Sequence, residues 1–347
     1  MDKEKLALFF LALLALIAGG FVLKAAQSVI LPLVIAWLLT FVIGPVINVM
    51  TKHKIPLPIA VLCVIILLFG IGYIAVVFLH GRVFAIMAEF PKYEERFGQL
   101  LEELSGFAHL KYNPLADFDW AKTIRDLLVR LSGSLFSILV NLVLIIIFLV
   151  FLLLGKPYAH YKIGRALSDD QAERITRIIA SISSEISRYL SVQVLISFIT
   201  GVLVWLALSV IGVDFAVTWG ALAFVLNFIP NIGSIIATVP PVLLALVQYY
   251  PGIWPAVVTL VVLVTIQMAI GNFVAPKVFG DRLNLSPVVV LLSLLFWGWL
   301  WGIVGALLSI PIASSIKIIC ENIEELRPIS VMMGSGRRYW QESQENG

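Results

Sequence analysis

Long apolar segments dominate the pattern of residues along this chain. A helix needs about 20 apolar residues to cross the hydrocarbon core of a bilayer. In the first two thirds of the chain, the stretches that meet this requirement are 6–23, 29–50, 57–80, 135–154 and 191–212. The first of them lacks a polar cleavage region after its apolar run, so we interpret it as a retained membrane segment and not as a signal peptide. The pattern predicts an all-α, polytopic transmembrane helical bundle.

After residue 213 the apolar pattern is interrupted twice, at Asn227–Gly233 and at Trp297–Gly302. Irregular backbone at membrane depth survives only where protein buries it or where it lines a wet cavity. We therefore predict a hairpin, a spanning helix and a second hairpin, for about six full spans and two broken-helix or re-entrant hairpins. The segments are 214–228 and 232–248 for the first hairpin, 253–275 for the span, and 286–297 and 301–320 for the second hairpin.

Two hydrophilic regions separate the membrane segments. Residues 90–107 and 120–131 carry apolar residues at helical spacing on either side of a turn at Asn113–Pro114. We interpret 82–134 as a small helical extracytoplasmic loop domain that lies on the membrane surface or on a neighbouring subunit, in preference to a ligand-binding domain. Residues 155–190 form a second amphipathic segment, interpreted as an interfacial or coupling helix.

The domain organisation follows from these segments. We expect N-terminal membrane helices, the extracytoplasmic loop, further membrane helices that include the amphipathic helix 155–190, a transport core with two hairpins, and a cytoplasmic tail. Their ranges are 1–81, 82–134, 135–212, 213–320 and 321–347.

Composition and charge agree with a membrane protein. The 347 residues are 61% hydrophobic and 13% charged, and the mean hydropathy is +1.02. Lysine and arginine concentrate in the short loops on the side of the N-terminus, which predicts that both termini are cytoplasmic. The net charge of +3 is spread over these loops and not over one face, so we expect no nucleic-acid partner.

The sequence shows no arrangement that is typical of an enzyme. The histidines are scattered without metal-ligand spacing, and there is no catalytic triad, phosphate loop or dinucleotide fingerprint. We expect no catalytic activity, no cofactor and no metal centre. The acidic residues nearest the hairpins, Asp214 and Asp281, fall outside the predicted midplane, which argues against a proton-antiport site built on buried aspartates.

The interior offers neutral polar residues instead. They are Gln193, Ser197, Thr200, Asn227, Asn231, Ser234, Thr238, Thr265, Gln267, Asn272, Ser286, Ser293 and Ser309. Serine and threonine often bond to their own helix, and asparagine and glutamine often join helices, so structural roles compete with binding roles. As substrate-binding residues we select Asn227, Pro230, Asn231, Gly233, Gln267, Asn272 and Ser286.

A gate is predicted at the second interruption. Its residues are Trp297, Gly298, Trp299, Trp301 and Gly302. The tryptophans are equally typical of the interfacial belt, and the glycines of close helix packing. Our hypothesis is that the tips of both hairpins approach each other and gate a central solute site.

The motifs around these interruptions resemble those of the autoinducer-2 exporter family. The resemblance rests on Asn227–Gly233 followed by Pro240–Pro241, on Pro276–Gly280 with Leu285–Pro287, and on Phe296–Gly302 with Gly305 and Pro311. Many relatives have a proline where this chain has Ser234. The resemblance implies a transporter of the bacterial cytoplasmic membrane, with some members associated with autoinducer-2 export and others with Na⁺/H⁺ exchange.

The expected function is therefore a secondary transporter, exporting a small polar solute such as autoinducer-2. The alternatives are a Na⁺/H⁺ antiporter of the same family and a channel or scaffold without coupled transport. Expected partners are the lipid bilayer, a small polar solute, Na⁺ or H⁺, and further copies of the chain, because the apolar faces of the external loop are large for a free loop.

Overall fold

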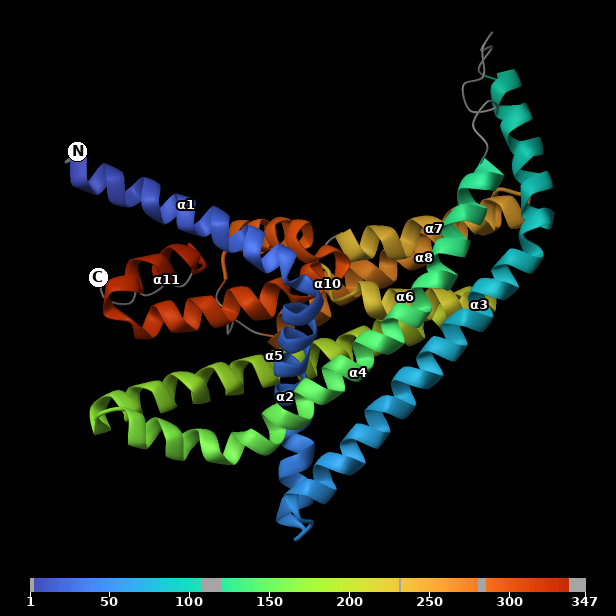
Figure 1. The fold of residues 1–347 in the computed structure, drawn as a ribbon. Coiled ribbons are helices and arrows are strands. Elements are labelled where there is room, and N and C mark those ends of the chain that lie inside the picture. The colour runs from blue at the N-terminus through green and yellow to red at the C-terminus, as the bar shows by residue number, and fades with distance from the viewer. Residues whose placement is uncertain (1–2, 108–119, 231, 280–284, 337–347) are drawn as a thin grey trace. The chain divides into compact units, whose positions relative to one another are not determined.

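A computed structural model describes residues 3–107, 120–230, 232–279 and 285–336 of the chain (Figure 1). Most of the residues in these ranges are helical, and the β-type pairing found within them is an isolated bridge between Leu285 and Gly334. The predicted all-α class is confirmed. The turn predicted at Asn113–Pro114 lies outside the described residues.

The chain divides into two compact units. The first unit contains Met1–Ile66, Val143–Ser191 and Asp281–Gly347, and the second contains Leu67–Leu142 and Val192–Gly280. Helices within the first unit are α1 (Lys3–Ala25), α2 (Gln27–Lys52), α10 (Pro287–Asn322), the short 3₁₀-helix η2 (Glu324–Leu326) and α11 (Arg327–Met333). Helices within the second are α6 (Ala216–Leu226), α7 (Ile232–Gln248), α8 (Trp254–Met268), the π-helix η1 (Ala269–Val274) and α9 (Ala275–Phe279). Three long helices pass from one unit to the other: α3 (Leu57–Phe107), α4 (Trp120–Ala166) and α5 (Asp169–Ile211).

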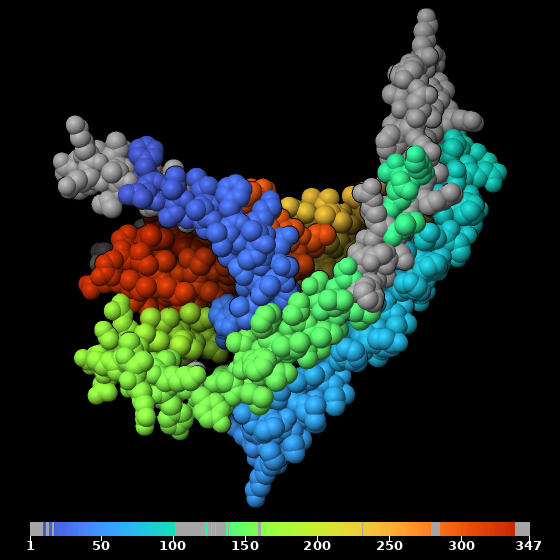
Figure 2. All heavy atoms as spheres, viewed as in Figure 1, coloured from blue at the N-terminus to red at the C-terminus, as the bar shows by residue number. Residues whose placement is uncertain are grey.

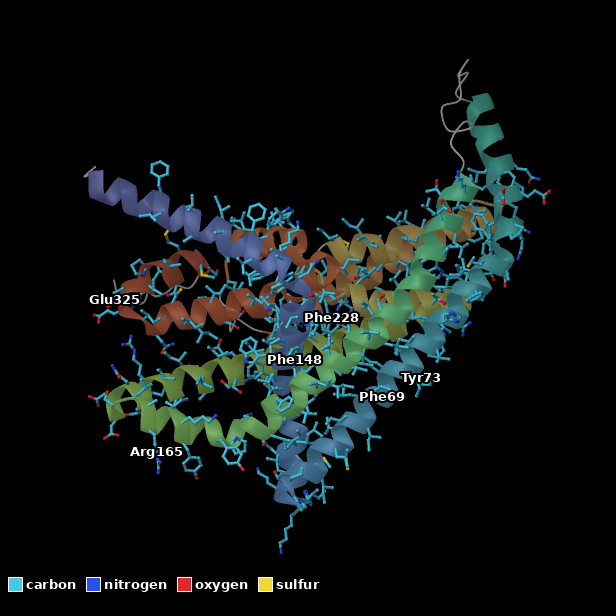
Figure 3. All side chains as sticks on the ribbon, viewed as in Figure 1. Phe69, Tyr73, Phe148, Arg165, Phe228 and Glu325 are labelled. Carbon is cyan, nitrogen blue, oxygen red and sulfur yellow. The ribbon has the colours of Figure 1, made fainter. Side chains whose placement is uncertain are left out.

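Among the described residues, 6 helices are long and apolar enough to cross a membrane. They are Gln27–Lys52, Leu57–Leu100, Leu139–Tyr158, Asp169–Ile211, Trp254–Val278 and Pro287–Asn322. The membrane segment predicted at 6–23 is also helical, within α1. On α3, large apolar side chains such as Phe69 and Tyr73 are exposed along the helix (Figure 3), as expected of a surface that faces lipid. Figure 2 shows atoms of α3 at the surface.

The amphipathic segments predicted to be external are continuous with the spans and do not form separate helices. Helix α3 runs for 51 residues through the predicted boundary near residue 82, and α4 likewise runs through residue 134. Pro91 and the glycines in this region weaken a helix by amounts that a long apolar helix tolerates. Of the predicted external stripe, Tyr93 and Leu100 are buried within this chain.

The amphipathic segment predicted at 155–190 is likewise divided between two helices. Helix α4 ends at Ala166 and α5 begins at Asp169. Ser168 followed by Gln171 is typical of a helix start, and the acidic first turn of α5 favours a new N-terminus. The two halves of this segment are therefore extensions of the membrane helices on either side of a short turn.

In the first unit, α10 packs against α1, α2, η2 and α11. Helix α2 contains Pro45, which has no N–H to donate to the carbonyl of Phe41 four residues earlier. The Ser187 hydroxyl of α5 donates a hydrogen bond of 2.8 Å to that carbonyl. A side chain from α5 thus satisfies the polar group that proline leaves free inside the apolar bundle.

In the second unit, α6 packs against α7 and α7 packs against α8. Helix α5 crosses α6 at small residues. A methyl group added at Gly201 would lie 2.8 Å from the carbonyl oxygen of Gly220, and one added at Gly220 would lie 2.7 Å from that of Gly201. Glycine at both positions lets the two backbones touch, as small residues do in membrane helix pairs. This crossing places the middle of α5 against the first hairpin.

Candidate functional site

The first predicted interruption is a tight helical turn. Helix α6 has only 11 residues and ends at Leu226, before Pro230, which disfavours helix at the residue preceding it. Helix α7 begins at Ile232, and the Gly233 N–H donates to the carbonyl of Ile229 over 3.1 Å. We call α6, this turn and α7 hairpin 1.

Close backbone contact closes the turn of hairpin 1. A methyl group at Gly233 would lie 1.9 Å from the carbonyl oxygen of Leu226, a distance that no side chain can occupy. Gly233, selected from the sequence as a binding residue, therefore has a clear structural role in bringing the two helices together. Asn231, selected with it, lies outside the described residues.

A buried polar cluster lies beside the end of α6. The Gln193 side-chain amide of α5 donates to the carbonyl of Asn227 over 2.7 Å, and the Asn227 side-chain amide donates to the Ser197 hydroxyl over 3.0 Å. Gln193 and Ser197 are 7% and 0% exposed. Among the described residues, no hydrogen-bond donor is paired with the Asn227 side-chain oxygen. The cluster thus holds Asn227 in place and leaves its side-chain oxygen without a donor among the described residues.

A second pair of neutral groups joins the beginning of α7 to α8. The Ser234 hydroxyl donates to the side-chain oxygen of Gln267 over 3.0 Å, and the Thr238 hydroxyl donates to the Ser234 carbonyl over 2.8 Å. Ser234 and Gln267 are both half-buried. Of the residues selected from the sequence, Asn227, Pro230, Gly233 and Gln267 therefore belong to hairpin 1 and the helices that pack on it.

Asn272 lies in a different environment. It belongs to the π-helix η1, where the Ala275 N–H donates to the carbonyl of Ile270, five residues earlier. Pro276 has no N–H for the Asn272 carbonyl, and a π turn relieves the clash that proline causes in an α-helix. The Asn272 side chain is exposed, so the structure does not bring it to the cluster around Asn227.

Ser286 belongs to the first unit. It precedes α10, and its N–H donates to the carbonyl of Met333 at the end of α11 over 2.8 Å. Together with the Leu285–Gly334 bridge, this bond ties the start of α10 to the C-terminal helix. The structure therefore shows a structural contact for Ser286, separate from the residues of hairpin 1.

The second predicted interruption is also a hairpin, although α10 is continuous by length. In a straight helix, residues 293 and 309 would lie about 24 Å apart. Instead the Ser293 hydroxyl donates to the carbonyl of Ser309 over 2.8 Å, and a methyl group at Gly305 would lie 1.9 Å from the Trp297 carbonyl oxygen. The two halves of α10 are therefore antiparallel (Figure 1), and we call them hairpin 2.

The turn of hairpin 2 is narrower than the sequence predicted. Trp301 (φ −126°, ψ 16°) and Gly302 (φ 63°, ψ −143°) leave the helical conformation, whereas Trp297, Gly298 and Trp299 remain helical. Only glycine readily adopts the backbone angles of Gly302, so the chain reverses at this residue. The expectation that the whole stretch from Trp297 to Gly302 is irregular is wrong.

The tryptophans of the predicted gate face different surroundings. Trp301 is 7% exposed, and its ring nitrogen donates to the carbonyl of Leu23 over 3.4 Å. Trp297 contacts Trp301 with tilted rings, whose centroids are 4.9 Å apart. Trp299 is 57% exposed and lies beneath the Lys24 ammonium, 4.3 Å from its ring centroid. A Trp–Lys pair of this kind is typical of a membrane interface.

The site includes residues that the sequence selection omitted. Gln193 and Ser197 were recognised as interior polar residues, but they were not selected as substrate-binding residues. With Thr200 they have the spacing i, i+4 and i+7, which places them on one face of α5. That spacing is the available signal. Asn227, the hydrogen-bond partner of Gln193 and Ser197, is distant from them in the sequence, so only the fold identifies this contact.

The chemistry of the cluster around Asn227 is neutral. Gln193, Ser197 and Asn227 supply amide and hydroxyl groups and no formal charge, as does the separate Ser234–Gln267 pair. In the part of the chain that the structure describes, no group of three or more His, Cys, Asp or Glu residues could hold a metal ion. The arrangement suits an uncharged solute that both donates and accepts hydrogen bonds.

Comparisons with known proteins agree with a transport function. Residues 9–325 match the family described as AI-2E family transporter. The chain is 34% identical over 340 residues to the putative transport protein YhhT of Escherichia coli K12, covering 94% of this chain and 93% of that protein. It is 32% identical over 328 residues to a putative transport protein of Borreliella burgdorferi, covering 94% and 90%. It is 30% identical over 328 residues to the AI-2 transport protein TqsA of Escherichia coli K12, covering 93% and 94%.

Proposed function

This chain belongs to the AI-2E family of transporters, and we propose that it exports a small polar solute such as autoinducer-2 as a secondary transporter. The observation that carries this proposal is the end of α6, where Asn227 meets the buried Gln193 and Ser197 of α5. We further propose that the protein resides in the bacterial cytoplasmic membrane with both termini in the cytoplasm.

Hairpin 1 supports a solute site for a physical reason. A helix that ends inside the membrane leaves backbone carbonyls without partners from the helix itself. Gln193 satisfies one of them, the carbonyl of Asn227, and fixes the Asn227 side chain beside Ser197. A solute with several hydroxyl groups would complete the remaining hydrogen bonds and so favour the occupied state.

The absence of charge in the cluster around Asn227 supports an uncharged polar solute. A buried charge without a partner would oppose the entry of a neutral molecule and attract counter-ions. The amides of Asn227 and Gln267 and the hydroxyls of Ser197 and Ser234 instead match a sugar-like molecule. The name of the relative TqsA, an AI-2 transport protein, supports the same choice.

Hairpin 2 is the proposed gate. Trp301 and Gly302 form its turn, and Gly298 lies on its inner side, where an added methyl group would meet the Ala306 side chain at 3.8 Å. A turn held by a single glycine can change its backbone angles with little steric cost. We propose that this turn, with Trp297 and Trp299 beside it, opens and closes during transport.

Flux measurements test the proposed function against its alternatives. The purified protein is reconstituted into liposomes, and uptake of labelled autoinducer-2 and of sugar-like analogues is measured with a Na⁺ gradient, with a proton gradient and with neither. Solute accumulation against its own gradient, in at least one gradient arm, is the expected result. Equal flux in all arms would indicate a channel, and cation exchange without solute flux would indicate a Na⁺/H⁺ antiporter.

A further inference from the structure

A group of hydrogen bonds lies at the base of hairpin 1, at the end opposite its turn. The base consists of residues 212–215, before α6, and residues 248–249, where α7 ends. The Asp214 N–H donates to the side-chain oxygen of Gln248 over 2.8 Å, and the Gln248 side-chain amide donates to the carbonyl of Gly212 over 2.8 Å. The Gln248 side chain therefore joins the two ends of the hairpin.

Further contacts constrain the backbone of this base. The Tyr249 hydroxyl lies 2.8 Å from the carbonyl oxygen of Gly212, and the Trp219 ring nitrogen donates to the carbonyl of Asp214 over 3.2 Å. Next to Asp214, Phe215 adopts φ 58° and ψ 27°, left-handed angles that residues other than glycine rarely adopt. Such a conformation persists where the surrounding contacts determine it.

Helix α3 bonds to both ends of the base. The Tyr93 hydroxyl donates to a carboxylate oxygen of Asp214 over 2.5 Å, and the Lys92 ammonium lies 3.8 Å from the same oxygen. Arg96, one turn further along α3, donates to the carbonyl of Gln248. Neighbouring turns of α3 thus hold the residue before α6 and the residue that ends α7.

The bond from Tyr93 is the best shielded of these contacts. Tyr93 is 8% exposed, and the centroid of its ring lies 6.4 Å from that of Phe215. The Glu89 carboxylate is a more distant acceptor, 3.4 Å from the Tyr93 hydroxyl. The Lys92 and Asp214 side chains are 50% and 33% exposed, and ion pairs open to solvent contribute little. A hydrogen bond to a carboxylate contributes more, so Tyr93 decides how firmly α3 holds hairpin 1.

We propose that Tyr93 is a positioning residue for the solute site: through Asp214 it holds the base of hairpin 1 and so fixes α6, whose other end carries Asn227. Helix α6 is one segment of 11 residues, about 16 Å long, and Gln193 and Ser197 bond to its Asn227 end. Without the bond from Tyr93, a shift of the base is transmitted along α6. All of these residues belong to the second unit. The hold on α6 stands on these contacts alone, and its effect on solute binding rests on the function proposed above.

Hydrogen–deuterium exchange tests the hold on α6 without any solute. Exchange is measured on the full-length protein in liposomes, for peptides that cover α6. Tyr93→Phe removes only the hydroxyl, so the α6 amides should exchange about tenfold faster than in the unaltered protein. The matched control is Tyr73→Phe, at an exposed tyrosine of the same helix, which should leave α6 unchanged. Equal exchange of α6 in both variants would overturn the proposal.

Solute flux in the same liposomes tests the positioning of Asn227. Tyr93→Phe should raise the half-saturating concentration of labelled autoinducer-2 by about threefold or more, with little change in the maximal rate, because it disturbs solute binding and no later step. Asp214→Ala, which removes the acceptor, should have the same effect. Asp214→Asn keeps an acceptor oxygen for Tyr93, so it should recover most of the affinity that Asp214→Ala loses.

The possible outcomes separate this inference from the proposed function. Faster exchange of α6 in Tyr93→Phe, in a protein that moves no autoinducer-2, would support the hold of Tyr93 on α6 and count against the transport function. Faster exchange with an unaltered half-saturating concentration would overturn the positioning role and leave Tyr93 a packing residue. Equal losses of affinity in Asp214→Asn and Asp214→Ala would also overturn it, because the charge of Asp214 would then matter and the bond from Tyr93 would not.

Discussion

At the scale of single residues, a close contact between a glycine and a backbone carbonyl closes the turn of each hairpin. Gly233 and Gly305 each follow a turn, and at each a methyl group would lie 1.9 Å from a carbonyl oxygen of the opposite helix. The backbone itself forms these contacts, so no change of rotamer could make room for a larger side chain at either glycine. Around this turn, the hydrogen bond from Gln193 to the carbonyl of Asn227 fixes the end of α6.

Gly233→Ala should therefore destabilise hairpin 1. We expect a loss of about 1–3 kcal/mol of folding free energy, because overpacking at a rigid contact has a cost of that size. Thermal unfolding of the purified protein in detergent measures it. The matched control is Gly70→Ala in α3, where nothing lies within 4 Å of the added methyl group. Equal melting temperatures for both variants would show that the turn is looser than the structure describes.

At the scale of elements, the chain alternates uninterrupted helices with folded-back ones. Helices α3, α4 and α5 have 51, 47 and 43 residues, whereas hairpin 1 and hairpin 2 reverse direction at Pro230 and at Gly302. In an apolar surrounding, a reversal exposes backbone groups, and the Gln193 side chain satisfies the carbonyl of Asn227 beside the reversal of hairpin 1. In hairpin 2, the Ser293 hydroxyl joins the two antiparallel halves through the carbonyl of Ser309.

Cross-linking tests the reversal in α10. The native cysteines, Cys63 and Cys320, are free and are replaced first. In that background, Ser293→Cys/Ser309→Cys should form a disulfide with mild oxidant, because the two positions are in hydrogen-bond contact. Phe69→Cys/Ala85→Cys in α3 has the same separation in sequence and should form none. The absence of a bond in the first pair, with both cysteines reactive toward maleimide, would mean that α10 is straight.

Local signals in the sequence predicted most of the elements and only part of the site. Apolar length and the proline of the first interruption are local, so hairpin 1 was placed to within a few residues. The reversal at Gly302 was placed too broadly, since three tryptophans and two glycines offer several possible turns. The role of Gln193 depends on a partner, Asn227, that is more than 30 residues away in the sequence. Apolar periodicity carries no information on such contacts.

At the scale of the whole molecule, the structure is a multi-pass helical membrane protein of a transporter family. Each unit carries one hairpin: hairpin 1 belongs to the second unit and hairpin 2 to the first. Their approach to each other during transport stays a prediction. Assembly into a homo-oligomer also stays a prediction, which light scattering of the detergent-solubilised protein would check.

Membrane orientation is tested by labelling on intact cells. The distribution of lysine and arginine predicts that residues 82–134 are outside and that the turn between α4 and α5 is inside. In a cysteine-free background, a membrane-impermeant maleimide should modify Asn113→Cys and should not modify Ser168→Cys until the cells are opened. Ser168 is exposed in that turn, so its protection can only come from the membrane. The reverse pattern of labelling would invert the orientation.

The central claim is that Asn227 binds the transported solute, and the most direct test is solute flux in liposomes. Asn227→Ala removes both the bond to Ser197 and the acceptor for the solute, so flux should fall at least about tenfold, equivalent to about 1.4 kcal/mol. Asn141→Ala, an exposed asparagine of α4, is the matched control and should transport as the unaltered protein does. Flux of Asn227→Ala equal to that of Asn141→Ala, at equal protein content, would contradict the claim and leave Asn227 a packing residue.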